Sequence, residues 1–194
     1  MRTGLFGRRA RACDAPVLSI VHITVRAGKL DFELSCDAER LHVDAGTAAR
    51  VLEALPNLAR HVCVNRRGER FGDEVEGTEA AHLFEHVAIE LLGQAFPEQA
   101  AHSAFRGYTT YADAAPGGLE AGAVAMRTTI SCADDLSAMC AAREALHVVN
   151  WAFGTSGRAS GHGPGGKPGK EAAAPPDIEA MVRAVASASR ALPC

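Results

Sequence analysis

Two segments near the start of the chain alternate apolar and polar side chains, which is the pattern of half-buried β-strands. Residues 18–27 alternate β-branched residues with polar ones, and residues 30–36 repeat the alternation. Gly28 and Lys29 stand between the two segments and suit a tight turn. The pattern therefore predicts a β-hairpin.

Helical periodicity and further alternation follow along the rest of the chain. The periodic segments predict helices over residues 44–55, 79–95, 134–153 and 177–192, and the alternating ones predict strands over 61–65, 106–111 and 123–132. Thr78 is a suitable N-cap for the second helix, and Pro97 is a suitable stop. This order predicts an α+β fold: a two-layer sandwich of a mostly antiparallel sheet with two long helices on one face.

The distribution of apolar residues also predicts the domain organisation. Residues 15–153 form the expected single domain, preceded by a flexible arm at residues 1–14. Residues 154–176 are rich in Gly, Ser, Pro and Lys, which is typical of a disordered linker. Residues 177–194 then carry the C-terminal helix.

Composition narrows the classes of function. The formal net charge of −3 provides no basic field, so we expect no nucleic-acid partner. No apolar stretch approaches the roughly 18 residues that a membrane span needs. The six cysteines include no CxxC pair, and no signal-peptide core follows the first arginines. We therefore expect a cytoplasmic protein with reduced thiols and no membrane association.

The helix predicted over residues 79–95 carries the candidate chemistry. His82 and His86 are one turn apart, and Glu79, Glu85 and Glu90 lie on the same side of the helical wheel. The rest of the circumference is apolar, and the polar stripe contains no Lys or Arg. A solvated face usually mixes charges of both signs, so this stripe favours a divalent cation over an ordinary surface role.

The spacing of these residues indicates which cation and which roles. Histidines at i and i+4 bring two imidazoles to one ion, and His-x-x-Glu-His is the inverzincin signature. The pattern thus predicts zinc bound by His82 and His86, with Glu85 as the general base. Glu79 and Glu90 become candidates for substrate or outer-shell contacts.

The same region resembles the amino-terminal domain of cyanophycin synthetase. The resemblance covers roughly residues 40–153, with a proline-containing turn, a His-x-Cys element at His61 and Cys63, and a last helix with Arg143 and Asn150. Its most specific block comprises Glu76, Gly77, Thr78, His82, Glu85, His86, Ala88 and Glu90.

This resemblance implies chemistry on a polymer of aspartate with arginine side groups. In some synthetases the corresponding domain is similar to a zinc metallopeptidase that cuts the polymer into primers. The chain has no segment resembling the ATP-grasp or Mur-ligase-like parts, so we expect no ligase activity from it alone. A cyanophycin synthetase is a possible partner.

One departure from the family pattern leaves the third metal ligand open. The strand before the last long helix usually carries glutamates, but residues 127–132 contain none. Cys132 is a candidate replacement, as in the two-His, one-Cys zinc site of S-ribosylhomocysteine lyase, or it is a small buried residue. Asp134 and Glu144 are weaker candidates. His61 and Cys63 share one strand face and suit either second-shell or substrate contacts or core packing.

The sequence thus supports three hypotheses. The first is a stand-alone zinc-dependent metallohydrolase that cleaves an amide or peptide bond, for example in an Asp/Arg polymer. The second is a non-catalytic module that binds the polymer or a partner synthetase. The third is a lyase or other metal chemistry in the same pocket.

Overall fold

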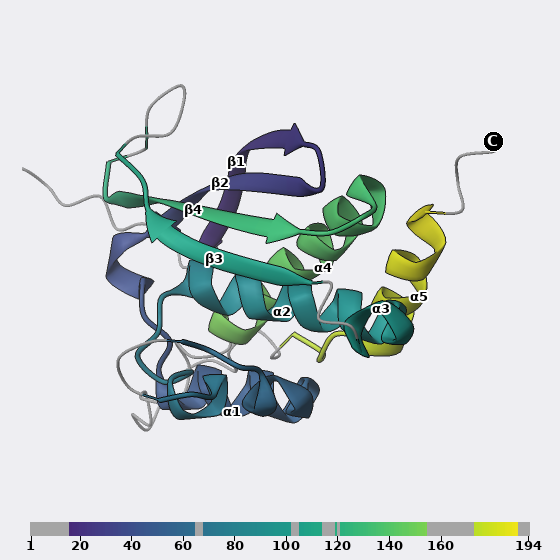
Figure 1. The fold of residues 1–194 in the computed structure, drawn as a ribbon. Helices are drawn as coiled ribbons and strands as arrows, with labels where there is room; N and C mark the ends of the chain where they lie inside the picture. The colour runs from purple at the N-terminus through teal and green to yellow at the C-terminus, as the bar shows by residue number, and fades with distance from the viewer. Residues whose placement is uncertain are drawn as a thin grey trace, which may run out of the picture.

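A four-stranded antiparallel sheet forms one layer of the protein in the computed structural model, which describes residues 16–64, 68–101, 105–113, 119, 121–154 and 173–189. The strands are β1 (Leu18–Arg26), β2 (Lys29–Asp37), β3 (Arg106–Tyr111) and β4 (Ala123–Ser131). Their order is β1-β2-β4-β3, so β1 and β3 are the edge strands (Figure 1). The predicted hairpin is confirmed, with Gly28 at a φ of 69° in its turn.

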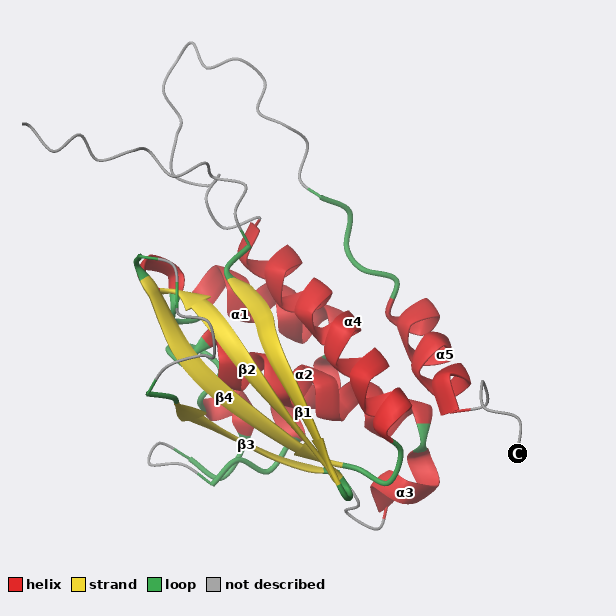
Figure 2. Cartoon of the chain, turned by 90° about the horizontal axis from the view of Figure 1, so that it is seen from above, coloured by secondary structure: helices red, strands yellow, loops and turns green. Residues whose placement is uncertain are grey.

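The helices lie on one face of this sheet, as Figure 2 shows from above. The confirmed α+β fold comprises α1 (Ala45–Ala54), α2 (Ala80–Ala95), α3 (Pro97–Ala101), α4 (Asp135–Gly154) and α5 (Ile178–Ala188). Three 3-10 turns occur at Ala38–Arg40, Pro56–Arg60 and Phe71–Asp73. Helices α2 and α4 pack against the sheet and each other, and α1 and α5 pack against α4.

The core forms where the apolar face of the sheet meets α2. Alternate residues of β2 are fully buried, and the aromatic rings of Phe32 and Phe84 meet edge to face at 5.9 Å between centroids. Helix α2 is buried around most of its circumference, so several of its polar side chains also lie inside the protein. Glu85, His86 and Glu90 are only 5–6% exposed, which excludes an ordinary solvated face.

Polar pairs cover the opposite face of the sheet. Asp31 accepts hydrogen bonds from Thr129 and Arg26, and Arg127 donates to Glu33 at 3.0 Å. This division of the two faces is typical of an antiparallel sheet that packs on one side only.

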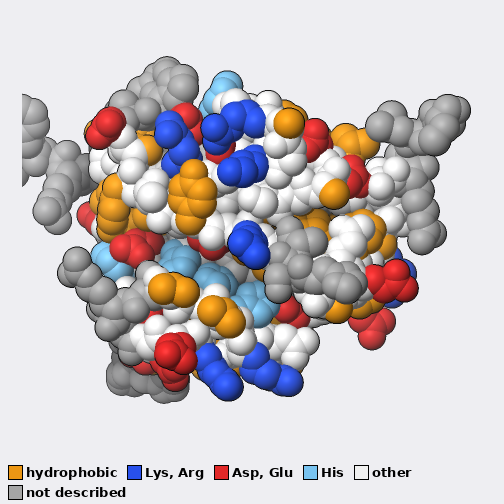
Figure 3. Space-filling view, in the orientation of Figure 1, with side chains coloured by type: hydrophobic (Ala, Val, Ile, Leu, Met, Phe, Trp, Pro, Cys, Tyr) orange, Lys and Arg blue, Asp and Glu red, His pale blue; other side chains and the backbone are white. Residues whose placement is uncertain are grey.

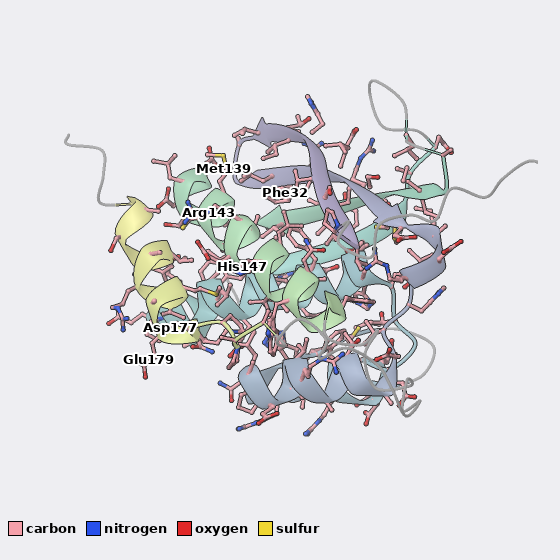
Figure 4. All side chains as sticks on the ribbon, turned by 180° about the vertical axis from the view of Figure 1, so that it is seen from behind. Phe32, Met139, Arg143, His147, Asp177 and Glu179 are labelled. Atoms are coloured by element: carbon pink, nitrogen blue, oxygen red, sulfur yellow. The ribbon has the colours of Figure 1, made fainter. Side chains whose placement is uncertain are left out.

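Helix α4 ties the first strand to the helical layer. The amide of Asn150 accepts a hydrogen bond from the Leu18 N–H at 3.0 Å and donates one to the Leu18 carbonyl at 2.8 Å. Figure 4 shows Arg143, with Met139 and His147, on the side of α4 seen from behind, beside the hairpin and α5. Of the two residues that the family pattern places on this helix, Asn150 therefore binds backbone, and Arg143 pairs with Glu144.

Two local predictions were wrong. The described part of segment 61–65 is not a strand; it makes a single bridge, Val62 with Arg70, because the preceding 3-10 turn at Pro56–Arg60 sets it apart from the sheet. The N-cap of α2 is Glu79, not Thr78. The predicted helix stop at Pro97 is confirmed, since α2 ends at Ala95; Pro97 then begins the short helix α3.

Two further predictions fall mainly on residues that the structure does not describe. The arm at residues 1–14 lies outside the described residues, as does most of the linker at 154–176. In the described part of the chain, no helix combines the length and apolarity that crossing a membrane requires.

Candidate metal centre

Three potential metal ligands converge at the N-terminal half of α2. His82 and His86 come from successive turns of this helix, and Cys63 comes from the segment that follows the 3-10 turn Pro56–Arg60. Each residue offers one ligand atom, and these atoms all lie within 4.8 Å of one another. Two imidazoles and a thiol at this separation form a set that suits zinc.

His82 is oriented by contacts at both ring nitrogens. Its Nδ1 lies 2.7 Å from the Thr78 hydroxyl oxygen, and its Nε2 lies 3.4 Å from the Cys63 sulfur. Glu79 has an extended backbone and is the N-cap, so the helix begins one residue later than expected. The Thr78 hydroxyl does not cap the helix and contacts the His82 imidazole instead. The Nε2 atom is therefore the nitrogen that faces the cysteine.

A chain of hydrogen bonds through His61, Glu90 and Gln94 orients the His86 ring. The Nδ1 atoms of His86 and His61 are 3.2 Å apart, and the His61 Nε2 lies 2.8 Å from a Glu90 carboxylate oxygen. Gln94 donates to the other Glu90 oxygen at 2.7 Å. Metal-binding histidines in proteins are usually oriented by such outer contacts.

Phe71 provides an apolar wall for both imidazoles. Its ring stacks on His86 with centroids 3.9 Å apart and meets His82 edge-on at 5.5 Å. Phe71 is fully buried at the start of a 3-10 turn, and its backbone N–H donates to the His61 carbonyl. The wall limits the freedom of the two rings and shields them from solvent.

Burial controls the charge of the cluster. Burial lowers the pKa of His82, although Glu79 and Glu74 act to raise it. Burial and the neighbouring imidazoles of His82 and His61 lower the pKa of His86 to about 2. Burial, with Glu74 and Glu85 nearby, raises the pKa of Cys63 to about 11. Both imidazoles are therefore neutral at pH 7, the form that ligates metals, while the thiol needs a cation to ionise.

Glu85 points from α2 towards β3. Its carboxylate accepts a hydrogen bond from Thr109 at 2.7 Å, and it occupies the space beside Gly107, where an added Cβ would lie 2.7 Å from its Cγ. Burial raises the pKa of Glu85 to about 7, although the bond from Thr109 opposes this shift. A carboxyl group with this pKa can both accept and release a proton near neutral pH.

The remaining acidic residues of the stripe have separate surroundings. Tyr111 donates its hydroxyl to Glu79 at 3.0 Å on the rim of the cluster. Burial acts to raise the pKa of Glu90, but hydrogen bonds from His61 and Gln94 outweigh it and keep that pKa below its usual value. Glu90 is thus an ionised partner of His61.

Histidine side chains reach the surface between the sheet and the segments around α1. Figure 3 shows them as a row across the middle of this face of the molecule. His82 is partly exposed, whereas Cys63 and His86 are about 6% and 5% exposed. A molecule from solvent could therefore approach the cluster from this side.

The third member of the cluster is Cys63, whereas the sequence analysis expected Cys132 as the third metal ligand. Cys132 lies at the end of β4, where its thiol donates to the Asp134 carbonyl at 3.5 Å, and it is not part of the cluster within the described residues. Asp134 caps the start of α4 through its bonds to Leu136 and Ser137, and Glu144 pairs with Arg143.

Sequence reasoning missed several residues around the cluster. Thr78 was expected to cap the helix, and no role at the site was predicted for Phe71, Gly107 or Thr109. The one available signal was the alternation that puts His61 and Cys63 on one face, and it could not rank Cys63 above Cys132 as a ligand.

The fold and the cluster define an α+β domain with a candidate three-ligand metal centre. The family model for the cyanophycin synthase-like N-terminal domain matches residues 29–151, so the chain belongs to that family. A search of curated proteins finds no match.

Proposed function

We propose that this protein is a stand-alone zinc-dependent hydrolase of amide or peptide bonds. Cys63, His82 and His86 would hold the metal, and Glu85 would be the general base. The observation that carries this proposal is the convergence of a thiol and two imidazoles within 4.8 Å on a helix that also presents a buried carboxyl group.

The donor set fits a catalytic zinc site. Catalytic zinc commonly has three protein ligands and leaves a fourth position for water or substrate. The contacts of Thr78 to His82 and of His61 to His86 are the outer contacts that such ligands need. Both imidazoles are already neutral, and a cation at this position would remove the cost of ionising the buried Cys63 thiol.

The side chains of the chain itself supply the remaining chemistry. When bound, zinc would contribute Lewis acidity, which lowers the pKa of a water molecule and polarises a carbonyl group. Glu85 would take one proton from the attacking water and deliver it to the amide nitrogen that leaves. Thr109 would hold the carboxylate in position for both transfers.

The family suggests the substrate. Its name connects the domain with cyanophycin, so we propose an Asp/Arg polymer or a related peptide as the substrate, and a cyanophycin synthetase as a possible partner, in the cytoplasm. Glu74 and Glu79 act electrostatically on His82, and such carboxylates suit arginine side groups.

A specific observation favours a second function, a non-catalytic module that binds the polymer or a partner. Strand β4 presents no carboxylate to α2 in its described residues; Thr128 faces α2 instead and contacts Thr109 at 2.8 Å and the Ala81 carbonyl at 3.4 Å. In this alternative, Glu85 would only buttress β3 through Thr109.

Metal analysis and polymer hydrolysis separate these functions. We expect about one zinc per purified chain, and release of soluble fragments from cyanophycin granules. Glu85→Gln should keep the metal and lower fragment release by about 10²–10⁴-fold, because the general base is lost. Glu179→Gln, at a side chain 90% exposed on α5, is the matched control and should change neither quantity.

The outcomes identify the function directly. Granule binding without fragment release, equal in the wild type and in Glu85→Gln, would select the module. Absence of bound zinc, together with unchanged release after chelation, would contradict the metal centre.

A further inference from the structure

We infer that the outer edge of β3, which pairs with no other described strand, binds the substrate as an extended peptide chain that adds to the sheet as a further strand. The inference rests on the proposed function, because it states how the substrate of that site lies. Strand β3 is the last strand in the order β1-β2-β4-β3, and Figure 1 shows it running along α2. It is therefore the sheet edge next to the cluster.

The register determines which backbone groups point to this edge. The Ala112 N–H donates to the Ala125 carbonyl, and these residues continue the β3–β4 register in which Tyr111 pairs with Met126. Hydrogen-bonded and non-hydrogen-bonded pairs alternate in an antiparallel ladder. The N–H and C=O groups of Tyr111, Thr109 and Gly107 consequently point away from β4.

The side chains of Thr109 and Tyr111 face α2, the helix that carries two of the candidate metal ligands. Thr109 donates to Glu85, Tyr111 donates to Glu79, and Gly107 leaves room for the Glu85 side chain. A chain bound to this edge would thus lie next to the carboxyl group that we propose as general base. Main-chain hydrogen bonds would hold it in an extended conformation, as in other cases of strand addition.

Charge determines which kind of peptide fits. Glu79 and Glu74 act electrostatically on His82; Glu74 is buried, whereas Glu79 is partly exposed and accepts the hydrogen bond from Tyr111 at this edge. Tyr111, 59% exposed, adds an aromatic surface beside Glu79. We therefore assign the edge to a peptide that carries cationic side groups, since carboxylates and an aromatic face both attract guanidinium groups.

Hydrogen exchange with the full chain tests the docking geometry. The probe is an aspartate hexamer with arginine linked to each side chain, added to the wild type and to Glu85→Gln, in which the probe should survive. We expect exchange at the Gly107, Thr109 and Tyr111 amides to slow about tenfold or more, with little change at Tyr108 and Thr110, which already bond to β4. No protection, or equal protection at all five amides, would overturn the inference.

A pair of substitutions tests the same edge through affinity. Tyr111→Ala removes the side chain but keeps the outward N–H, whereas Tyr111→Pro removes both; proline is tolerated where an edge N–H faces solvent. We expect the proline variant to bind the labelled hexamer about 3- to 10-fold more weakly than the alanine variant, the effect of one lost hydrogen bond. Equal affinities of the two variants would overturn the inference, and if the proline variant does not fold, the exchange pattern decides.

The two proposals fail in different ways. Fragment release without the alternating protection would contradict the strand addition and leave the hydrolase intact. Alternating protection without fragment release from the wild type would support the edge site and contradict the hydrolase.

Discussion

At the scale of single residues, the Cys63 and Cys132 thiols are both buried but differ in their neighbours. Cys63 lies 3.4 Å from the His82 ring, whereas Cys132 bonds to a backbone carbonyl at the end of β4. We predict that Cys63→Ser weakens zinc binding by about 100-fold or more, because a hydroxyl is a much poorer zinc ligand than a thiolate. Cys132→Ser is the matched control and should leave the affinity within about twofold of the wild type.

Competition with a chromophoric chelator measures both affinities. The reverse result, in which Cys132→Ser loses zinc and Cys63→Ser retains it, would restore the ligand set expected from the sequence. It would also require the end of β4 to move towards α2.

Two titrating groups in the cluster act on stability in opposite directions in the metal-free protein. The pKa of His86 is lowered to about 2, so below about pH 6.5 the unfolded chain binds a proton that the folded chain excludes. The contribution of His86 therefore lowers the free energy of unfolding as the pH decreases. The pKa of Glu85 is raised to about 7, so between about pH 4.5 and 7 the folded chain keeps a proton that the unfolded chain has lost, and stability rises as pH falls. The two slopes oppose each other in the window that they share.

Glu85→Gln removes only one of these slopes. On moving from about pH 6.5 to 4.5, we expect the variant to lose about 2 kcal/mol more unfolding free energy than the wild type, because the Glu85 contribution no longer offsets that of His86. Urea unfolding at the two pH values, with a chelator present, measures the difference. Parallel pH profiles would show that the Glu85 carboxyl is not protonated preferentially in the folded state.

At the scale of elements, the periodic patterns predicted most of the structure. Alternation strongly favours a strand, and a helical period strongly favours a helix. The structure has strands over most of residues 18–27 and 30–36 and helices over most of residues 79–95 and 134–153. Segment 61–65 also alternates, but the nearby 3-10 turns place its described part, residues 61–64, beside α2 and not in the sheet. Alternation correctly placed His61 and Cys63 on one face, although the strand itself is absent there.

Contacts between elements could not be predicted in the same way. The meeting of Cys63 with His82, or of Thr109 with Glu85, joins segments that are 19 and 24 residues apart in sequence. Periodicity indicates which face of each element is buried, but it does not determine the order of strands in the sheet. The position of β3 at the edge, beside α2, therefore became clear only from the structure.

At the scale of the whole molecule, the packed unit is larger than the region that the family model matches. The match covers residues 29–151, but Leu18 of β1 and Val185 of α5 are both fully buried. Trp151 donates to the Ala173 carbonyl, and the Ser137 hydroxyl donates to the Val185 carbonyl, so hydrogen bonds also join α4 to the last described segment. Strand β1 and helix α5 thus complete a core that the matched region alone leaves open.

This extended core gives α5 a measurable share of the stability. Val185→Asp places an unpaired carboxyl between α5 and α4, and we expect it to cost about 3–5 kcal/mol and to lower Tm by roughly 10 °C. Arg183→Ala is the control, since Arg183 is 67% exposed and its pairing with Glu179 at 3.5 Å is worth little; it should stay within about 0.5 kcal/mol of the wild type. Calorimetry of the full chain measures both. Equal Tm values of the two variants would mean that α5 does not contribute to the folded core. In that case β1, α4 and the candidate metal centre would fold without α5.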